Sequence, residues 1–171
     1  MIVLMAGLPG TGKTTLAREL AGLTGGRVLS KDEVRHSLFA ADEIEYSAGQ
    51  DDFCLQVMLE TAGQLWQRDP NRIIFLDGRT FSRRHQIDNV VSAAASLHQS
   101  WRILECVCLE ESAKRRLEKQ SAQRQHPADN RNFQLYLEVR FRFEAITLPK
   151  AVIDTEKALA ECVELALAAL R

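Results

Sequence analysis

The stretch GLPGTGKT at residues 7–14 has the spacing of a loop that binds the phosphates of a nucleotide. It follows an apolar strand pattern and opens a helical pattern, which is the context that G-x-x-x-x-G-K-[ST] requires. Its glycines let backbone N–H groups turn inward at a helix N-terminus, where they favour anionic oxygens. Lys13 would add a charge for the β- and γ-phosphates, and the Thr14 hydroxyl is placed to bind Mg²⁺. The predicted nucleotide-binding residues are Gly7, Leu8, Pro9, Gly10, Thr11, Gly12, Lys13, Thr14 and Thr15.

A second block, SKDEVR, places Asp32 in the first turn of a predicted helix, just past a short strand. A carboxylate there is favoured by the helix dipole by about 0.3–1 kcal/mol, so Asp32 could serve only to start the helix. Glu33, however, already forms a capping box with Ser30. Ligands of an open parallel sheet bind beyond the carboxyl ends of the strands, where Asp32 can accept the proton of an incoming hydroxyl. Arg35 shares its helix face and can hold both Asp32 and an anionic part of a substrate.

A third block, DGRTFSRRHQ, begins with Asp77 at the end of another predicted strand. Asp77 is either an outer Mg²⁺ partner or substrate contact, or an acid that caps the following turn, and both interpretations stay open. Arg79 or Thr80 could reach an acceptor. Arg83 and Arg84 open the next helix, where cations are mildly unfavourable, so a ligand or an acidic neighbour would explain them.

The basic segment late in the chain has eight basic and three acidic residues between positions 114 and 142. A solvated helix face would explain this excess. Arg116 and Arg124, however, flank a polar break, where a lid would bring guanidinium groups onto a transferring phosphoryl group. Arg124 would either take that role or stack on adenine. Beyond the break, Phe133, Leu137 and Phe141 recur at helical spacing, which predicts core packing.

Short apolar runs that alternate with helical patterns predict an α/β fold with a parallel sheet flanked by helices. The chain of 171 residues is long enough for one such domain and short for two. The expected strands are residues 1–6, 27–30, 72–77, 102–109 and 151–154.

The formal net charge of −1 argues against a protein that coats nucleic acid. The first apolar stretch, MIVLMAGL, is too short to span a bilayer, and no signal peptide is recognisable, so we expect a cytoplasmic protein without a membrane partner. No Asn-Lys-x-Asp is present to specify guanine, and the third strand ends in a single acid rather than the pair typical of motor ATPases.

The P-loop, SKDEVR, LDGRTFSRRHQ and FRFEAITLPKAVIDTEKALAECV resemble a family of AAA-type P-loop kinases. That family is related to the 5′-kinase domain of polynucleotide kinase, chloramphenicol phosphotransferase, gluconate kinase and the zeta toxins. The resemblance covers nearly all of residues 1–171. It implies a five-stranded parallel sheet with the third strand beside the first, like that of nucleoside monophosphate kinases. It also implies a helical lid over ATP, here at about residues 114–131. In polynucleotide kinase the matching Asp and Arg act as base and substrate contact, and these roles transfer to Asp32 and Arg35.

These observations together predict an ATP- and Mg²⁺-dependent phosphotransferase that acts on a hydroxyl of a small molecule. Lys13, Asp32, Arg35 and Arg116 are its predicted catalytic residues, and Thr14 and Asp77 its metal contacts. The alternatives are a kinase of nucleic-acid 5′-hydroxyl ends and a non-catalytic, toxin-like nucleotide-binding regulator. The stretch ADEIEYSAGQ is expected to border the acceptor pocket, where its acids would repel a polyanion. The oligomeric state is left open.

Overall fold

The computed structural model describes residues 1–122 and 132–171, and its centre is a five-stranded parallel sheet. The strand order is β2-β3-β1-β4-β5, so the third strand pairs with the first, as the resemblance implies. The predicted α/β class with a five-stranded parallel sheet is therefore confirmed. The strands are β1 (Ile2–Ala6), β2 (Arg27–Ser30), β3 (Ile74–Asp77), β4 (Trp101–Val107) and β5 (Ala151–Asp154).

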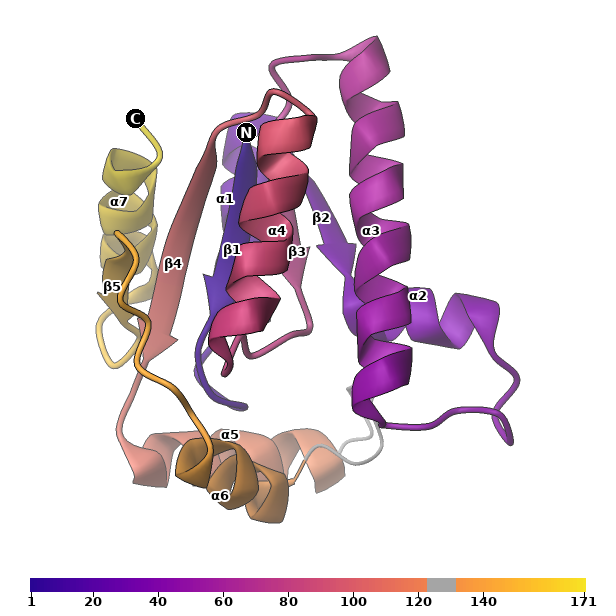
Figure 1. Ribbon diagram of the computed structural model, residues 1–171. Coiled ribbons are helices and arrows are strands. Elements are labelled where there is room, and N and C mark those ends of the chain that lie inside the picture. Colours follow the sequence, from indigo (N-terminus) through magenta and orange to yellow (C-terminus); the bar gives the residue numbers. More distant parts are fainter. Residues whose placement is uncertain (123–131) are drawn as a thin grey trace.

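Helices cover both faces of this sheet and its carboxyl edge (Figure 1). The packing clusters place α3 and α4 on one face and α1 and α7 on the other. Helices α5 and α6 lie beyond the carboxyl ends of the strands, with α2 at the side of the same edge. The helices are α1 (Lys13–Thr24), α2 (Lys31–Leu38), α3 (Ala48–Arg68), α4 (Arg84–Ser96), α5 (Glu110–Ala122), α6 (Phe133–Phe141) and α7 (Leu159–Ala169).

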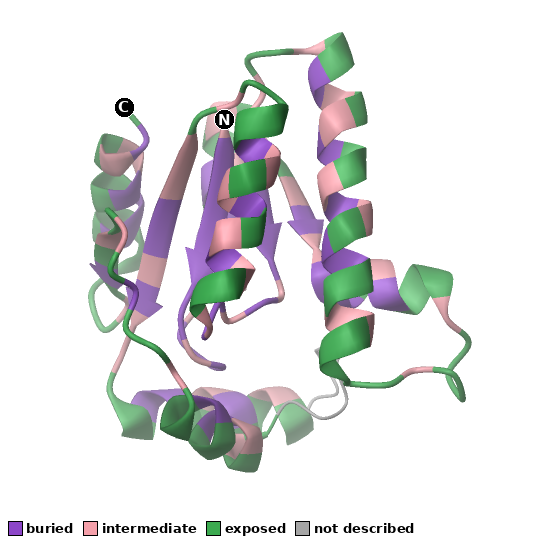
Figure 2. Cartoon of the chain, viewed as in Figure 1, coloured by how far each residue is buried: buried purple, intermediate pink, exposed green. Residues whose placement is uncertain are grey.

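Strand β1 is buried on both faces, as the central strand of a parallel sheet must be. Successive side chains of a strand point to opposite faces. Ile2 and Leu4 therefore join the cluster under α3 and α4, whereas Val3 and Met5 join the cluster under α1 and α7. Figure 2 shows this strand in the colour of the buried class. The chain leaves this rigid central strand directly into GLPGTGKT, so the core fixes the position of that loop.

The starts of α2 and α3 are fixed by serine caps. Ser30 Oγ accepts a hydrogen bond from the Glu33 N–H at 3.4 Å, and Ser47 Oγ accepts one from the Gln50 N–H at 3.2 Å. In the capping box predicted for α2, the Glu33 carboxylate would also accept a hydrogen bond from the Ser30 N–H. In the structure this carboxylate instead forms an ion pair with Arg18 at 3.3 Å. Each cap satisfies one N–H group that the helix itself leaves open.

The prediction that Phe133, Leu137 and Phe141 pack in the core holds in part for Phe133, which is half-buried and packs against Tyr136 and α5, and it is wrong for the other two. Phe141 is 96% exposed and Leu137 is also exposed, whereas Tyr136 and Val139 are the buried residues of α6. Helix α6 lies over the sheet edge rather than on a sheet face, so it buries only a narrow strip, in which Tyr136 packs with Ala113 and Leu117 of α5.

Among the described residues, no helix has the length and apolar character needed to cross a membrane.

Cys106 of β4 is completely buried, and burial raises the pKa of its thiol from 9.0 to about 12. As pH rises, the thiol loses its proton at a lower pH in the unfolded chain than in the folded protein. Between these two pKa values, deprotonation therefore favours the unfolded chain. We expect the free energy of unfolding to fall as pH rises from 9.0 toward about 12. Urea denaturation of the wild type and of Cys106→Ala at several pH values would measure this contribution. An identical pH dependence in both proteins would contradict it.

Candidate active site

The loop after β1 has a backbone that only glycine can provide at its first position. Gly7 has a φ of 126°, and a Cβ built there would lie 2.2 Å from the carbonyl oxygen of Cys106. At Gly10, with a φ of 79°, a Cβ would lie 2.9 Å from the carbonyl oxygen of Ala113 in α5. The loop is thus in close contact with β4 on one side and with α5 on the other. The predicted P-loop has the strand–loop–helix context that its sequence requires.

The lysine of this loop is buried inside it. Lys13 Nζ donates hydrogen bonds to the carbonyl oxygens of Gly7 at 2.8 Å and Leu8 at 2.7 Å. Thr11 Oγ1 donates to the same Leu8 carbonyl at 2.8 Å. These bonds hold the loop closed around its ammonium group at the start of α1, where the helix dipole adds further positive potential. The arrangement is suited to binding a polyphosphate.

Two cavities of about 540 Å³ and 340 Å³ open at the carboxyl edge of the sheet on either side of this loop. The larger, which we call the nucleotide cavity, is lined by Gly10, Gly12, Thr15 and residues of α5 and of the segment after β5. The smaller, which we call the acceptor cavity, is lined by α2, the start of α3, the segment after β3 and α6. Among the described residues, both cavities are lined by Lys13, Thr14 and Asp77. A group transferred between the two cavities would pass these three side chains.

Arg116 lies in the nucleotide cavity and is held by the segment that follows β5. Its guanidinium donates to the Thr155 carbonyl at 2.8 Å, to Thr155 Oγ1 at 2.9 Å and to the Gly10 carbonyl at 3.4 Å. Thr155 Oγ1 in turn donates to the Thr11 carbonyl at 3.1 Å. The guanidinium is therefore fixed beside the loop, although it does not line the acceptor cavity. Arg124, the other predicted arginine, and the end of the predicted lid lie outside the described residues.

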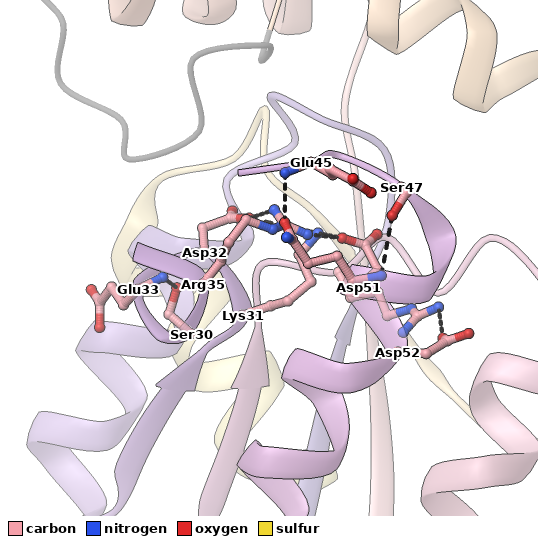
Figure 3. A network of polar contacts seen from close by, with 11 residues as sticks. Ser30, Lys31, Asp32, Glu33, Arg35, Glu45, Ser47, Asp51 and Asp52 are labelled. Carbon is pink, nitrogen blue, oxygen red and sulfur yellow. Dashed lines mark hydrogen bonds and ion pairs between the residues drawn. The ribbon is translucent and has the colours of Figure 1, made fainter. Parts of the chain in front are cut away.

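Asp32 and Arg35 are buried together on the wall of the acceptor cavity (Figure 3). Asp32 Oδ1 lies 3.3 Å from Arg35 Nη1 and 3.6 Å from Lys31 Nζ. The view in Figure 3 shows these side chains converging with Asp51, which comes from the first turn of α3. Asp51 Oδ1 accepts from Lys31 Nζ at 2.7 Å and from Arg35 Nη2. The predicted pair thus belongs to a larger cluster of two acids and two cations.

Arg79 is brought to the same cavity by a close approach of two chain segments. Gly78, with a φ of 83°, leaves room for the start of α2, since a Cβ there would lie 3.0 Å from the Lys31 nitrogen. The next residue, Arg79, is buried and donates from Nη2 to Asp52 Oδ1 at 2.6 Å. Lys31, Asp32 and Arg79 therefore line one cavity, although β3 lies far from α2 along the sequence.

Asp77 and Thr14 provide oxygen atoms where both cavities meet. Asp77 is 2% exposed, and its Oδ1 is buried without a hydrogen-bond partner in the part of the chain that the structure describes. A buried carboxylate oxygen without a partner is costly unless a cation or donor reaches it. Mg²⁺ binds through one or two protein oxygens and otherwise through water and substrate phosphates. The two residues therefore fit the predicted Mg²⁺ contacts. No group of three or more His, Cys, Asp or Glu side chains among the described residues could hold a metal by itself.

An acidic neighbour accounts for the two arginines at the start of α4. Glu144 accepts from Arg83 Nη1 at 2.8 Å and from the Arg84 N–H at 2.7 Å. The Arg84 N–H, followed by the Arg83 side chain, lowers the pKa of Glu144. Arg83 and Thr80 also line the acceptor cavity, whereas Arg84 does not. Arg84 is thus a surface residue with carboxylate partners.

The stretch ADEIEYSAGQ borders the acceptor cavity through Tyr46 and Ala48, as expected, but none of its acids lines the cavity. The acids that do line it from this region are Asp51 and Asp52, which sequence reasoning missed. The sequence does contain a signal for these two acids. Ser47 and Gln50 have the spacing of a helix start, and Asp51 and Asp52 follow them directly near the start of that helix. Arg142, another wall residue, was part of the basic segment but had no assigned role.

A family model described as an AAA domain matches residues 2–143. No match was found among curated protein sequences. A candidate kinase from Chloroflexus aurantiacus is similar in structure, with a TM-score of 0.75, 20% identity and coverage of 99% of this chain and 98% of the other.

Two further solved structures are similar over almost the whole chain. A gluconokinase from Sinorhizobium meliloti has a TM-score of 0.71 and 17% identity, and the match covers 99% of this chain and 90% of that one. The APS kinase of Mycobacterium tuberculosis, solved with AMPPNP and APS, has a TM-score of 0.73 and 14% identity, with 99% and 96% covered. At these identities the likeness shows the fold, and the family match shows the descent. The chain therefore belongs to this AAA domain family and has the fold of a P-loop kinase.

Proposed function

We propose that this protein transfers the γ-phosphoryl group of ATP to a hydroxyl of a small molecule. The observation that carries this proposal is the junction of the two cavities at Lys13, Thr14 and Asp77. A nucleotide whose phosphates are bound by the loop would have its terminal phosphate at this junction. An acceptor in the smaller cavity would meet that phosphate beside Asp32. The kinase-like fold of the structural neighbours supports the same reaction class.

The nucleotide would be held by the loop and by α5. Backbone N–H groups at the end of the loop and the start of α1, together with the Lys13 ammonium, would bind the β- and γ-phosphates. Arg116 adds positive charge from the nucleotide side, where its hydrogen bonds to Thr155 fix its position. Thr14 and Asp77 would hold Mg²⁺, which neutralises charge on the β- and γ-phosphates when it is bound.

Asp32 would act on the acceptor. Its carboxylate accepts the proton of the acceptor hydroxyl while that oxygen forms a bond to the γ-phosphorus and the bond to the β,γ-bridging oxygen breaks. ADP leaves with the bridging oxygen. Arg35 and Lys31 fix the carboxylate within the cavity wall, at 3.3 Å and 3.6 Å from Asp32 Oδ1. Helices α5 and α6, which lie beyond the carboxyl ends of the strands, would limit access of water, which otherwise competes with the acceptor for the phosphoryl group.

A panel of acceptors tests the proposal. ADP release from ATP and Mg²⁺ would be measured with sugars, nucleosides and 5′-hydroxyl oligonucleotides, and we expect stimulation by a small hydroxyl compound. Stimulation by oligonucleotides alone would favour a nucleic-acid kinase. Slow hydrolysis that no acceptor in a broad metabolite library accelerates would contradict phosphoryl transfer and favour a nucleotide-binding regulator.

A further inference from the structure

The acceptor cavity contains a buried guanidinium group, that of Arg79, whose hydrogen-bond donors are only partly used. Arg79 is 4% exposed and uses Nη2 to bind Asp52 Oδ1 at 2.6 Å. Its Nε and Nη1 atoms are buried without a hydrogen-bond partner among the residues that the structure describes. A guanidinium has five N–H donors, so the donor on Nε and both donors on Nη1 are unpaired. A buried charged donor without a partner is unfavourable, so a ligand that pairs with it gains affinity.

The charges around the cavity also favour a negative ligand. Six basic and four acidic side chains line it. Lys31 and Arg35 are balanced by Asp32 and Asp51, with which they form ion pairs. Arg142, which directly follows α6, also lines the cavity and pairs with no carboxylate in the described parts of the chain. Arg79 pairs with Asp52, and Arg83 pairs with Glu144, which does not line the cavity, so Arg142 contributes positive charge that no carboxylate of this wall balances.

We infer that the acceptor carries an anionic group, a carboxylate or a phosphate, and that Arg79 binds it. A guanidinium recognises both groups through charge-assisted hydrogen bonds. The cavity volume of about 340 Å³ suits a small hydroxy acid or phosphate ester rather than a polymer. This inference deepens the proposed function, because the anionic group selects which alcohol is presented to Asp32. The anion site itself can be tested without any phosphoryl transfer.

Inorganic phosphate is the first probe. It would be titrated calorimetrically, at constant ionic strength, onto protein saturated with AMPPNP and Mg²⁺, so that the P-loop is already occupied. We expect phosphate to bind the wild type, and Arg79→Gln to weaken this binding about 10–100-fold, the range for a lost hydrogen bond to a charged group. Arg84→Gln is the matched control, since Arg84 is exposed and does not line the cavity. AMPPNP affinity should be equal in all three proteins. Failure of phosphate to bind, or equal binding to Arg79→Gln, overturns the inference.

A second variant, Asp52→Asn, is expected to bind phosphate more tightly than the wild type, and a loss of folded protein cannot produce such a gain. Asp52 is half-exposed at the rim and occupies Nη2 of Arg79. Asp52→Asn removes a competing negative charge, so phosphate should bind several-fold more tightly than to the wild type. Weaker or unchanged binding to Asp52→Asn contradicts the assignment of the anion to Arg79.

Acceptors in matched pairs separate this inference from the proposed function. Each neutral alcohol would be compared with its carboxylated or phosphorylated counterpart, and we expect kcat/KM to favour the anionic member. Arg79→Gln should remove this preference by raising the KM of the anionic member. Phosphate binding that depends on Arg79, without transfer to any acceptor, would support the anion site and contradict the kinase proposal. Transfer to neutral alcohols without any phosphate binding would support the kinase proposal and contradict the anion site. A preference for 5′-hydroxyl oligonucleotides over small anions would overturn the small-anion inference.

Discussion

Replacing Asp32 with asparagine is expected to slow phosphoryl transfer about 10²–10⁴-fold, the usual contribution of a general base. The amide keeps the shape of the side chain and can still accept from Arg35, but it cannot take the proton of the acceptor. ATP affinity should stay close to that of the wild type, because Asp32 lines the acceptor cavity and not the nucleotide cavity. Single-turnover transfer rates and a nucleotide titration would measure the two effects separately.

Two further variants show whether the effect is specific to the Asp32 carboxylate. Asp88→Asn makes the same chemical change on the surface of α4, outside both cavities, and should leave transfer unchanged. Asp51→Asn tests the other carboxylate of the cluster, which accepts from Lys31 and Arg35. A much larger loss in Asp51→Asn than in Asp32→Asn would assign the base to Asp51. Normal transfer per folded molecule in a destabilised Asp32→Asn would make Asp32 a helix-start residue only.

Replacing Lys13 with alanine is expected to weaken nucleotide binding and to lower turnover about 10²–10³-fold, the effect of removing one group that stabilises developing negative charge. Both quantities should fall together, in contrast to the Asp32 variant, because Lys13 lines both cavities. The loop would also lose the donor for the carbonyl oxygens of Gly7 and Leu8. Fluorescent-nucleotide titration and ADP release would measure the two losses.

Lys119→Ala is the matched control for the lysine variant. Lys119 is an exposed residue of α5 that lines neither cavity, so nucleotide affinity and turnover should be those of the wild type. Thermal unfolding of both variants would show whether each protein is folded. A folded Lys13→Ala protein with wild-type ATP affinity would contradict the assignment of the loop to nucleotide binding.

The parts of the site that could be predicted are those coded by neighbouring residues. GLPGTGKT needs no tertiary information, because its glycines, lysine and threonine act within one loop between a strand and a helix. Asp32 and Arg35 are three residues apart on one helix, so their contact also follows from helical geometry. The position of Asp77 at a strand end followed from its apolar strand, and β3 beside β1 followed from the family resemblance.

The parts that escaped prediction depend on contacts between distant segments. Arg35 meets Asp51 across 16 residues, and Arg79 meets Asp52 across 27. Each contact requires the first turn of α3 to lie against α2 or against the segment after β3, and no local pattern specifies this. The interpretation of α6 failed at Leu137 and Phe141 for a related reason. Apolar spacing shows which residues share a helix face, but Phe141 is exposed because the packing of α6 buries a different strip.

Because the two cavities share few lining residues, substitutions can change the lining of one cavity without changing that of the other. Lys13, Thr14 and Asp77 alone are common to both walls in the described chain, and the remaining walls come from different residues, although α2 and the loop contribute some to each cavity. Substitutions at Tyr46, Ala48 or Arg79 therefore reshape one compartment while the other keeps its contacts. Under the proposed function, a change of acceptor would require substitutions only in α3 and the turn after β3, and the residues that line the nucleotide cavity would stay the same.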